Sequence, residues 1–187
     1  LTSRRKFGLI LAFNDVLFAA NNFNDSVVQY VQNQLEHAAN NATDAFMVAL
    51  MTANGTAANS VAAALAAFAG DLRTACWIGS PETLTTLQDA ANPNIGPRGG
   101  TYKTLPAIAS LAVPPGKLIL QDVQRIAVFD GPEIVERSNE ASIVMDTAPS
   151  TATSTPVSMF QQNMTALKIT KYADANLLAA PQIITLA

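Results

Sequence analysis

Charged side chains are scarce in this chain of 187 residues. They make up 13% of it, against about 25% in ordinary soluble domains, while hydrophobic residues make up 49%. A chain with so little charge has few groups with which to cover its surface. Two interpretations remain open: a surface buried against copies of the same chain, or a large alanine-rich core.

A large excess of charge of either sign is also absent. The formal net charge is −3 and the isoelectric point is about 5.0. Nucleic-acid grooves and segments that bind anionic membranes carry clustered lysine and arginine. The composition therefore indicates neither kind of partner.

Cysteine and histidine each occur once, as Cys76 and His37. One cysteine excludes a disulfide within the chain, which fits a reducing compartment. One cysteine and one histidine cannot supply the usual four ligands of a structural zinc site.

Long hydrophobic runs are missing. No segment reaches the roughly 18 apolar residues that a membrane-spanning helix needs. Residues 7–13 (FGLILAF) follow a basic stretch, residues 4–6, and precede small residues at 19–20, as in a signal peptide. The alternative is a strand with basic residues at its start. Asn14 and Asp15 interrupt the apolar run after seven residues, which favours the strand.

The dominant pattern predicts a helix over residues 24–53. Asp25 or Ser26 can cap its start, and Asn54-Gly55 offers a left-handed residue at its end. At 1.5 Å per residue it is about 40 Å long. One apolar stripe is expected from residues spaced by three or four: Val28, Val31, Leu35, Ala38, Ala42, Phe46 and Ala49. If this stripe is buried, Phe46→Ala should cost about 3–5 kcal/mol.

The remaining elements mix helices and strands without regular βαβ alternation, so the predicted fold class is α+β. Ser80-Pro81-Glu82 is a typical helix start. Residues 92–103 read as a mobile loop and residues 147–156 as an exposed linker. Helices are expected at 14–20, 60–69 and 81–91, and strands at 5–13 (covered on both faces), 75–78, 105–110, 117–121, 124–130, 158–172 and 182–186, with 133–137 and 141–146 forming a hairpin.

Catalytic motifs are not found. The GPRGGTYK run lacks the spacing of a phosphate loop, and there is no GxSxG elbow. Cys76 and His37 are conceivable as nucleophile and base, but Cys76 lies in the apolar run ACWI, where a cysteine is usually an inert core residue.

Carboxylates are scattered along the chain. Asp122 and Asp130 can meet across a hairpin and divide acid and base roles, although acids at strand ends are more often turn caps. We therefore expect no enzyme and assign no catalytic, cofactor-binding or metal residues. The other acids considered were Asp71, Glu82, Asp89, Glu133, Glu136, Glu140 and Asp146.

Four blocks of sequence resemble, in the same order, the major capsid proteins of tailed bacteriophages with the HK-ninety-seven-type fold. Their order and spacing carry the resemblance, which covers nearly all of the chain. Departures are Lys168, where the family often has arginine, the missing glycine before Leu105-Pro106, and the missing aromatic residue at 173–176. The blocks are residues 4–46 (RRKFGLILAF to TDAF), 76–89 (CWIGSPETLTTLQD), 105–138 (LPAIASLAVPPGKLIL to EIVERS) and 157–186 (VSMFQQNMTALKITKY to PQIITL).

The resemblance implies a flat subunit with a long spine helix, a peripheral domain and an axial domain. The peripheral domain would comprise residues 1–58 and 133–172. The axial domain would comprise residues 59–132 and the C-terminal strand in 173–187. An N-terminal arm and most of an extended loop are expected before residue 1, with residues 1–13 as the returning strand of that loop. A chain without these parts is not expected to close a stable shell.

The implied function is that of a structural subunit of an icosahedral phage or prophage capsid. It would self-assemble into pentamers and hexamers and enclose DNA without binding it specifically. No membrane, small molecule or cofactor is expected as partner. The expected location is the virion capsid, assembled in the cytoplasm of the bacterial host. The alternatives are an encapsulin-like shell around a protein cargo, or a small enzyme or ligand-binding domain that uses Asp122, Asp130 or Cys76.

Overall fold

The computed structural model describes residues 4–16, 25–146 and 150–186. The chain divides into two compact units, each described here by itself. Unit 1 comprises Leu1–Asn40 and Asp130–Ala173, and unit 2 comprises Asn41–Phe129 and Asp174–Ala187. The long helix α2 (Asp25–Asn54) forms as predicted and contributes its first half to unit 1 and its second half to unit 2.

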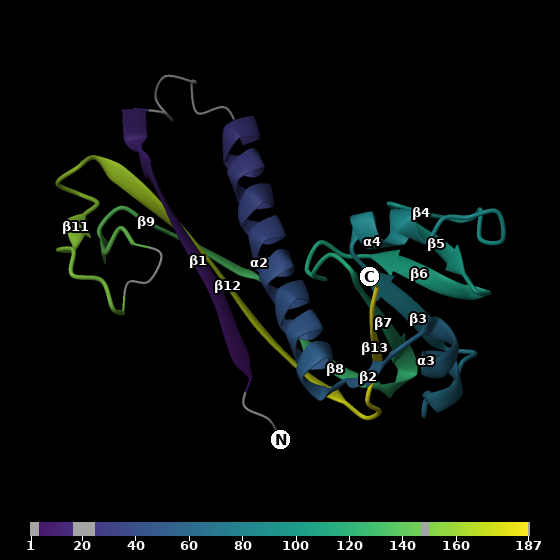
Figure 1. Cartoon of the computed structure of the whole chain (residues 1–187). Helices are drawn as coiled ribbons and strands as arrows, with labels where there is room; N and C mark the ends of the chain where they lie inside the picture. The colour runs from purple at the N-terminus through teal and green to yellow at the C-terminus, as the bar shows by residue number, and fades with distance from the viewer. Residues whose placement is uncertain (1–3, 17–24, 147–149, 187) are drawn as a thin grey trace. The chain divides into compact units, whose positions relative to one another are not determined.

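Unit 1 is built on a thin antiparallel sheet. Its central strand β12 (Met164–Leu177) pairs with β1 (Arg5–Asn14) over ten residues and, at its other edge, with β9 (Ile134–Ser138). The first half of α2 runs alongside this sheet (Figure 1). The core between them contains Val31, Leu35, Ala39, Leu167 and Ile169, with Leu11 and Phe13 packed against it.

Residues 7–13 belong to strand β1, as the strand alternative predicts. The expectation that this strand is covered on both faces is wrong: most of its residues are exposed or half-buried. The physical reason is its place at the edge of the sheet, where one neighbouring strand and one helix cannot cover it. Of the helical turn expected at 14–20, residues 17–20 lie outside the described residues.

The hairpin predicted for residues 133–146 is wrong. Strand β9 pairs with β12, whereas β10 (Ser142–Ile143) pairs with β11 (Val157–Ser158). The long edge of β12 offers β9 five residues of pairing, while β10 is only two residues long. Strand β12 itself starts at Met164 rather than at residue 158, because turns occupy 159–163 and Asn163 has a positive φ of 51°.

Unit 2 contains a seven-stranded sheet in the order β2-β13-β7-β3-β6-β5-β4. Helices α3 (Val61–Ala67) and α4 (Pro81–Thr86) accompany it, with Ser60 as the N-cap of α3 and Ser80, as predicted, as the N-cap of α4. Trp77, Leu118 and Ile184 lie in its core. The strands are β2 (Thr56–Ala58), β3 (Ala75–Gly79), β4 (Ile95–Gly96), β5 (Gly99–Tyr102), β6 (Leu105–Ala109), β7 (Lys117–Asp122) and β13 (Gln182–Thr185).

The predicted mobile loop at 92–103 is instead an ordered hairpin of β4 and β5 that extends this sheet. Ile95 and Tyr102 are buried in the core, and the Tyr102 carbonyl accepts a hydrogen bond from the Trp77 indole at 3.1 Å. Gly99 and Gly100 have positive φ, so the glycines serve a tight turn rather than mobility. Helix α4 ends at Thr86 instead of 91.

The apolar stripe predicted along α2 is confirmed in the first half of the helix at Val31 and Leu35, whereas Ala38 is half-buried and the side chain of Val28 lies outside the described ones. Val31 and Leu35 are buried, but Ala42 and Ala49 are exposed and Phe46 is half-buried. In the second half the buried positions are Val48 and Met51, which pack with Val113 and Ile119 of unit 2. The buried face changes because the two halves of the helix pack on different cores.

The predicted left-handed end of α2 is also wrong, since Gly55 has no positive φ. The helix leads directly into β2, which pairs in parallel with β13. A Cβ atom at position 55 would overlap the Ile183 side chain and approach the Met51 carbonyl oxygen to 2.9 Å. Glycine therefore allows the close approach of β13 to the helix end.

Candidate assembly surfaces

Cys76 and Asp122, the residues most conceivable for catalysis, have structural roles. Cys76 is buried in β3, and burial raises the pKa of its thiol to about 11. A thiol in that state is a poor nucleophile near neutral pH. His37 is exposed on α2. Cys76 therefore acts as a core residue.

Asp122 and Asp130 do not meet across a hairpin, because β7 and β8 (Ile126–Asp130) lie in different sheets. Asp122 is buried and accepts hydrogen bonds from the Thr74 hydroxyl at 2.7 Å and from the backbone N–H groups of Asp71 and Gln124 at 2.9 and 3.0 Å. Burial raises the pKa of Asp122, but these hydrogen bonds outweigh it and hold the pKa below its ordinary value. Asp122 is thus a turn cap.

Other acids also stabilise turns or pair on the surface. Asp89 accepts three hydrogen bonds from Ala91 and Asn92, which turns the chain after α4. Asp71 forms a salt bridge with Arg73. Among the described residues, no three His, Cys, Asp or Glu side chains gather as metal ligands would.

Lys171 forms a buried charge cluster that the sequence analysis does not predict. Its side chain is 7% exposed, and its Nζ lies 2.8 Å from Asn40 Oδ1, 3.0 Å from Asp130 Oδ1 and 3.4 Å from Glu133 Oε1. Burial alone lowers the pKa of Lys171, but Asp130 and Glu133 outweigh burial and raise it. The alternation of β12 contained the signal, because Lys171 shares the phase of the buried Leu167 and Ile169.

The cluster lies at the border of unit 1. Asn40 ends the first segment of this unit, Asp130 begins its second, and Lys171 lies two residues before that segment ends at Ala173. The ammonium group of Lys171 therefore connects β12 to Asn40 of α2 and to Asp130 at the start of the second segment. Nothing in this arrangement resembles a substrate site, because the cation already has three oxygen partners.

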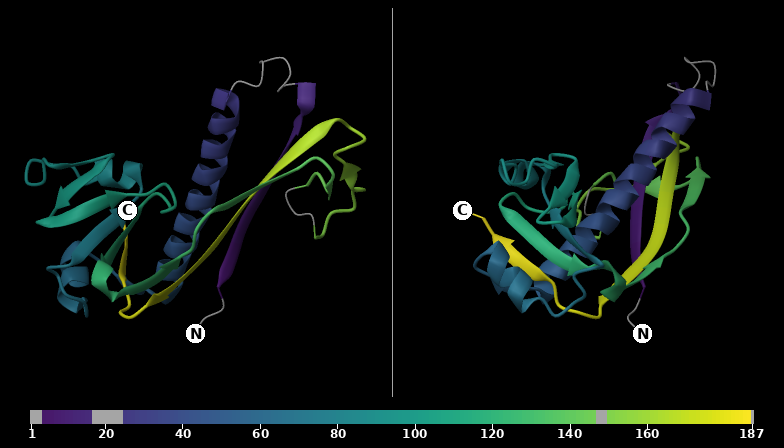
Figure 2. Two further views of the ribbon diagram at one scale, coloured as in Figure 1. Left: turned by 180° about the vertical axis from the view of Figure 1, so that it is seen from behind. Right: turned by 90° about the vertical axis from the view of Figure 1, so that its right-hand side faces the viewer.

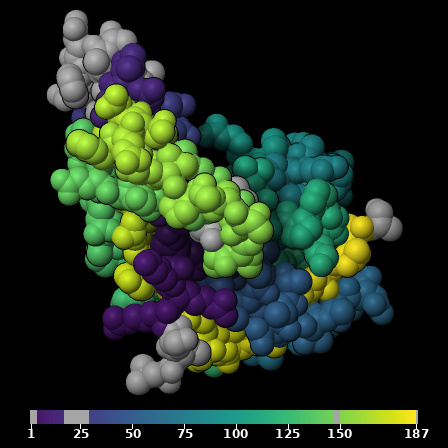
Figure 3. All heavy atoms as spheres, turned by 90° about the vertical axis from the view of Figure 1, so that its left-hand side faces the viewer, coloured from purple at the N-terminus to yellow at the C-terminus, as the bar shows by residue number. Residues whose placement is uncertain are grey.

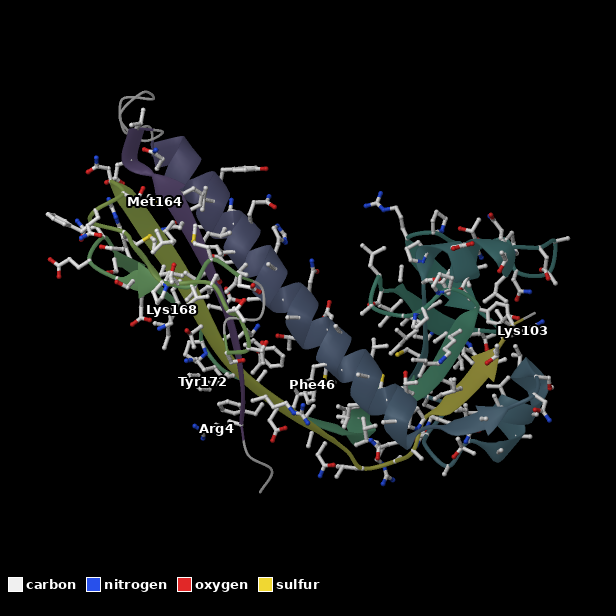
Figure 4. The ribbon with its side chains drawn as sticks, turned by 60° about the vertical axis from the view of Figure 1, so that its left-hand side comes forward. Arg4, Phe46, Lys103, Met164, Lys168 and Tyr172 are labelled. Carbon is white, nitrogen blue, oxygen red and sulfur yellow. The ribbon has the colours of Figure 1, made fainter. Side chains whose placement is uncertain are left out.

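Unit 1 exposes many large apolar side chains. On the sheet face that carries Ile169, Leu9 and Val135 are its cross-strand neighbours and lie exposed. The opposite face carries Lys168, paired with Glu136, and Tyr172, both labelled on β12 in Figure 4. The exposed apolar residues of unit 1 are Leu9, Ile10, Val16, Tyr30, Ile134, Val135, Met145, Phe160 and Tyr172.

Unit 2 exposes a second group and contains a groove of about 650 Å³. Met47, Val48 and Met51 of α2 line the groove together with Ile78, and Leu111 at its border is 90% exposed. The other exposed apolar residues of unit 2 are Leu72, Ile108, Val123, Val128, Phe129 and Leu178. Both units thus expose apolar area that is typical of surfaces buried on association.

Comparison with known proteins identifies the fold of the chain. No family model and no curated protein matches the sequence. Solved structures do match over 98% of the chain. A chain of Mycobacterium phage Bobi has a TM-score of 0.67 at 11% identity with 72% of its length covered, and one of Mycobacterium phage Ogopogo has 0.70 at 11% with 76% covered. The capsid of a native GTA (gene transfer agent) particle has 0.64 at 11% with 73% covered.

These likenesses define the class of fold. The chain has the HK-ninety-seven-type fold of phage and gene-transfer-agent capsid proteins, and the predicted resemblance is confirmed at that level. The α+β class with one long helix is confirmed as well. No helix within the described residues is long and apolar enough to cross a membrane.

Proposed function

We propose that this protein is the structural subunit of an icosahedral phage or prophage capsid, or of a related gene-transfer-agent shell. The observation that carries the proposal is the likeness over 98% of the chain to chains of two mycobacterial phages and to the capsid of a GTA particle, at TM-scores of 0.64 to 0.70. A fold by itself hosts many functions, so the surfaces of the chain have to support the same role.

The surfaces support it in two ways. Each unit exposes several large apolar side chains, and only 13% of the residues are charged. Rotationally related copies that meet through different patches close into rings, which is how pentamers and hexamers form. Cys76 and Asp122, the residues most conceivable for catalysis, have structural roles, which supports a protein that acts by assembly and not by catalysis.

The proposal includes a role for each part of the chain. Residues 1–58 and 133–172 form the peripheral domain with the spine helix, and residues 59–132 and 173–187 form the axial domain around the five-fold and six-fold axes. The compact units support a two-part division, although their first boundary falls within α2, after Asn40, and the proposed one falls beyond the helix, after residue 58. The net charge of −3 supports a shell that encloses DNA without binding it specifically.

The location follows from the same role: the subunit assembles in the cytoplasm of a bacterial host and resides in the virion capsid.

The test is to produce the full-length gene product in a bacterial host and to measure the size and content of what it forms. We expect large, uniform particles that protect DNA from nuclease. Particles that contain a protein cargo would favour the encapsulin-like alternative. A monomer that binds a small ligand saturably would overturn the shell proposal.

A further inference from the structure

The groove of unit 2 combines an apolar floor with one charged side chain. Met47, Val48 and Met51 of α2 form the floor together with residues of β3 and β6. Asp44 is the only charged residue among those that line the groove, and it is exposed. Within the described residues, no cation pairs with the Asp44 carboxylate. The groove therefore offers apolar area and one unpaired negative charge to an occupant.

The groove has the size and lining to accept a small element of another chain. Its volume is about 650 Å³, and Ile108 and Leu111 beside it are 50% and 90% exposed. Large apolar side chains in such positions are typical of surfaces that become covered on association. Methionine adapts its shape to whatever packs against it, so Met47 and Met51 can repack around an inserted turn.

The turn between β4 and β5 is a rigid projection of the same unit. Only Pro97 and Arg98 join the two strands, which form the edge of the sheet labelled in Figure 1. Ile95 and Tyr102 anchor the hairpin in the core. A Cβ atom at Gly96 would have open space around it, so the turn projects from the surface. Teal atoms, the colour of residues near 100, lie at the surface in Figure 3.

This turn presents the chemistry that the groove lacks. Arg98 is exposed, and within the described part of the chain no carboxylate pairs with its guanidinium group. Pro97 beside it is exposed as well and adds apolar surface. The other exposed cations of unit 2 already have neighbours that interact with them: Asp71 for Arg73, Asp71 and Asp122 for Arg125, and the Tyr102 ring for Lys103.

We propose that the groove of unit 2 binds the β4–β5 turn of a second copy of this chain, with Arg98 of the partner subunit paired to Asp44. Charge complementarity identifies the occupant, because the unpaired acid of the groove and the unpaired cation of the turn belong to the same chain. The aliphatic part of the arginine packs on the apolar floor, while its guanidinium group binds the carboxylate. A turn that is already rigid loses little conformational entropy on binding.

The contact is head-to-tail. The turn of one copy meets the groove of the next, so each copy uses two different surfaces and binds two neighbours. Such heterologous contacts close into rings when the rotation between copies allows it. The inference thus names residues through which the rings of the proposed shell form, and it rests on the proposed function for ring closure only. The pairing of turn and groove requires only a second copy.

Charge reversal in the full-length gene product tests the pairing. Arg98→Glu and Asp44→Lys each bring like charges together, so we expect either variant to lower the yield of rings and particles about tenfold or more in sedimentation. The double variant, Arg98→Glu with Asp44→Lys, restores opposite charges and should recover most of the yield. Lys103→Glu on the next turn and Glu36→Lys on α2 are matched controls, because they change the charge equally outside the contact, and they should assemble normally.

A mixture of the two single variants gives a sharper result. In a ring where Arg98→Glu and Asp44→Lys copies alternate, every turn meets a groove of opposite charge. Strict alternation is possible in a six-membered ring and impossible in a five-membered one. The mixture should therefore form six-membered rings without five-membered ones in electron micrographs. Single variants that assemble as well as the Lys103→Glu control, or a double variant no better than the single ones, would overturn the proposal.

Chemical coupling tests the same contact without shells. Arg98→Lys keeps the charge, and a carbodiimide can join the new amine to a carboxylate that it contacts. We expect linked dimers and longer chains, in which peptide mapping joins position 98 of one copy to Asp44 of another, and adding Asp44→Asn should remove that link. A link within a single copy, or no link to Asp44, would overturn the pairing whether or not shells form. Linked dimers of a chain that never forms shells would contradict the proposed function and leave the pairing intact.

Discussion

Replacing Lys171 by methionine tests whether the buried charge cluster stabilises unit 1. Methionine keeps most of the volume and removes the charge. Three oxygen atoms then lose their cation: those of Asn40, Glu133, which is 24% exposed, and Asp130, which is 59% exposed. Removing one partner of a fully buried ion pair costs about 3–5 kcal/mol. Water can reach Asp130, so we expect a smaller loss of about 2–3 kcal/mol.

The matched control is Lys168→Met, three residues away on the same strand. Lys168 pairs with Glu136, and both side chains are well exposed. Exposed pairs contribute little, so this control should cost much less. Figure 2 shows from two sides that β12 runs beside β1 and α2, so hydrogen exchange of these segments reports on unit 1. The fluorescence of the single tryptophan, Trp77, reports on unit 2 instead.

The stability that the Lys171 cluster contributes depends on pH, and the raised pKa of Lys171 gives the direction of that dependence. The pKa of Lys171 is raised in the folded state above the ordinary lysine value of 10.5. The cluster's contribution is therefore fully present below pH 10.5 and is lost as the pH rises through the folded-state pKa. The stability difference between the natural chain and Lys171→Met should be constant from about pH 6 to 9 and shrink only above 10.5. Equal stability of the Lys171 and Lys168 variants would refute the reasoning.

Three further predictions concern packing. Leu35→Ala should lower the free energy of unfolding by about 3–5 kcal/mol, because Leu35 is fully buried. Phe46→Ala should lower it by only about 1–2 kcal/mol, because Phe46 is half-buried. Urea unfolding followed by hydrogen exchange compares the two variants. Gly55→Ala should cost about 1–3 kcal/mol through overlap at the end of α2, while Gly96→Ala, with open space around its Cβ position, should be nearly neutral in thermal unfolding. Cys76→Ser should leave particle yield unchanged in sedimentation, and loss of a turnover activity in this variant would contradict the structural role.

Local signals in the sequence were enough for many elements. The periodic residues of α2, the Ser80-Pro81 start of α4 and the apolar run of β3 each predicted the element that the structure contains. These features depend on residues within one or two turns of chain. The order and spacing of the blocks then led to the fold, which single elements could not specify.

Features that depend on distant partners were not predicted. The 92–103 segment is rich in glycine and proline and looks mobile, but Ile95 and Tyr102 attach it to a core made by other segments. Strand β9 pairs with β12 and not with its neighbour in sequence, because the long edge of β12 is available. The drift of the buried face along α2 has the same origin: the helix packs on two cores.

The candidate surfaces also depend on partners that are distant in sequence, so the sequence could not predict them. Lys171 stood in the buried phase of its strand, which signals a paired cation, but its partners Asn40 and Asp130 are distant in sequence. The exposure of Ile10 and Leu9 follows from the edge position of β1, which no local pattern contains.

The most direct test of the central claim is an electron cryomicroscopy reconstruction of the assemblies formed by the full-length gene product. The account predicts closed shells in which copies of this chain form five-membered and six-membered rings, with residues 59–132 nearest the axes. A protein that stays solitary at every concentration and in every host, or assemblies without rings of this chain, would contradict it.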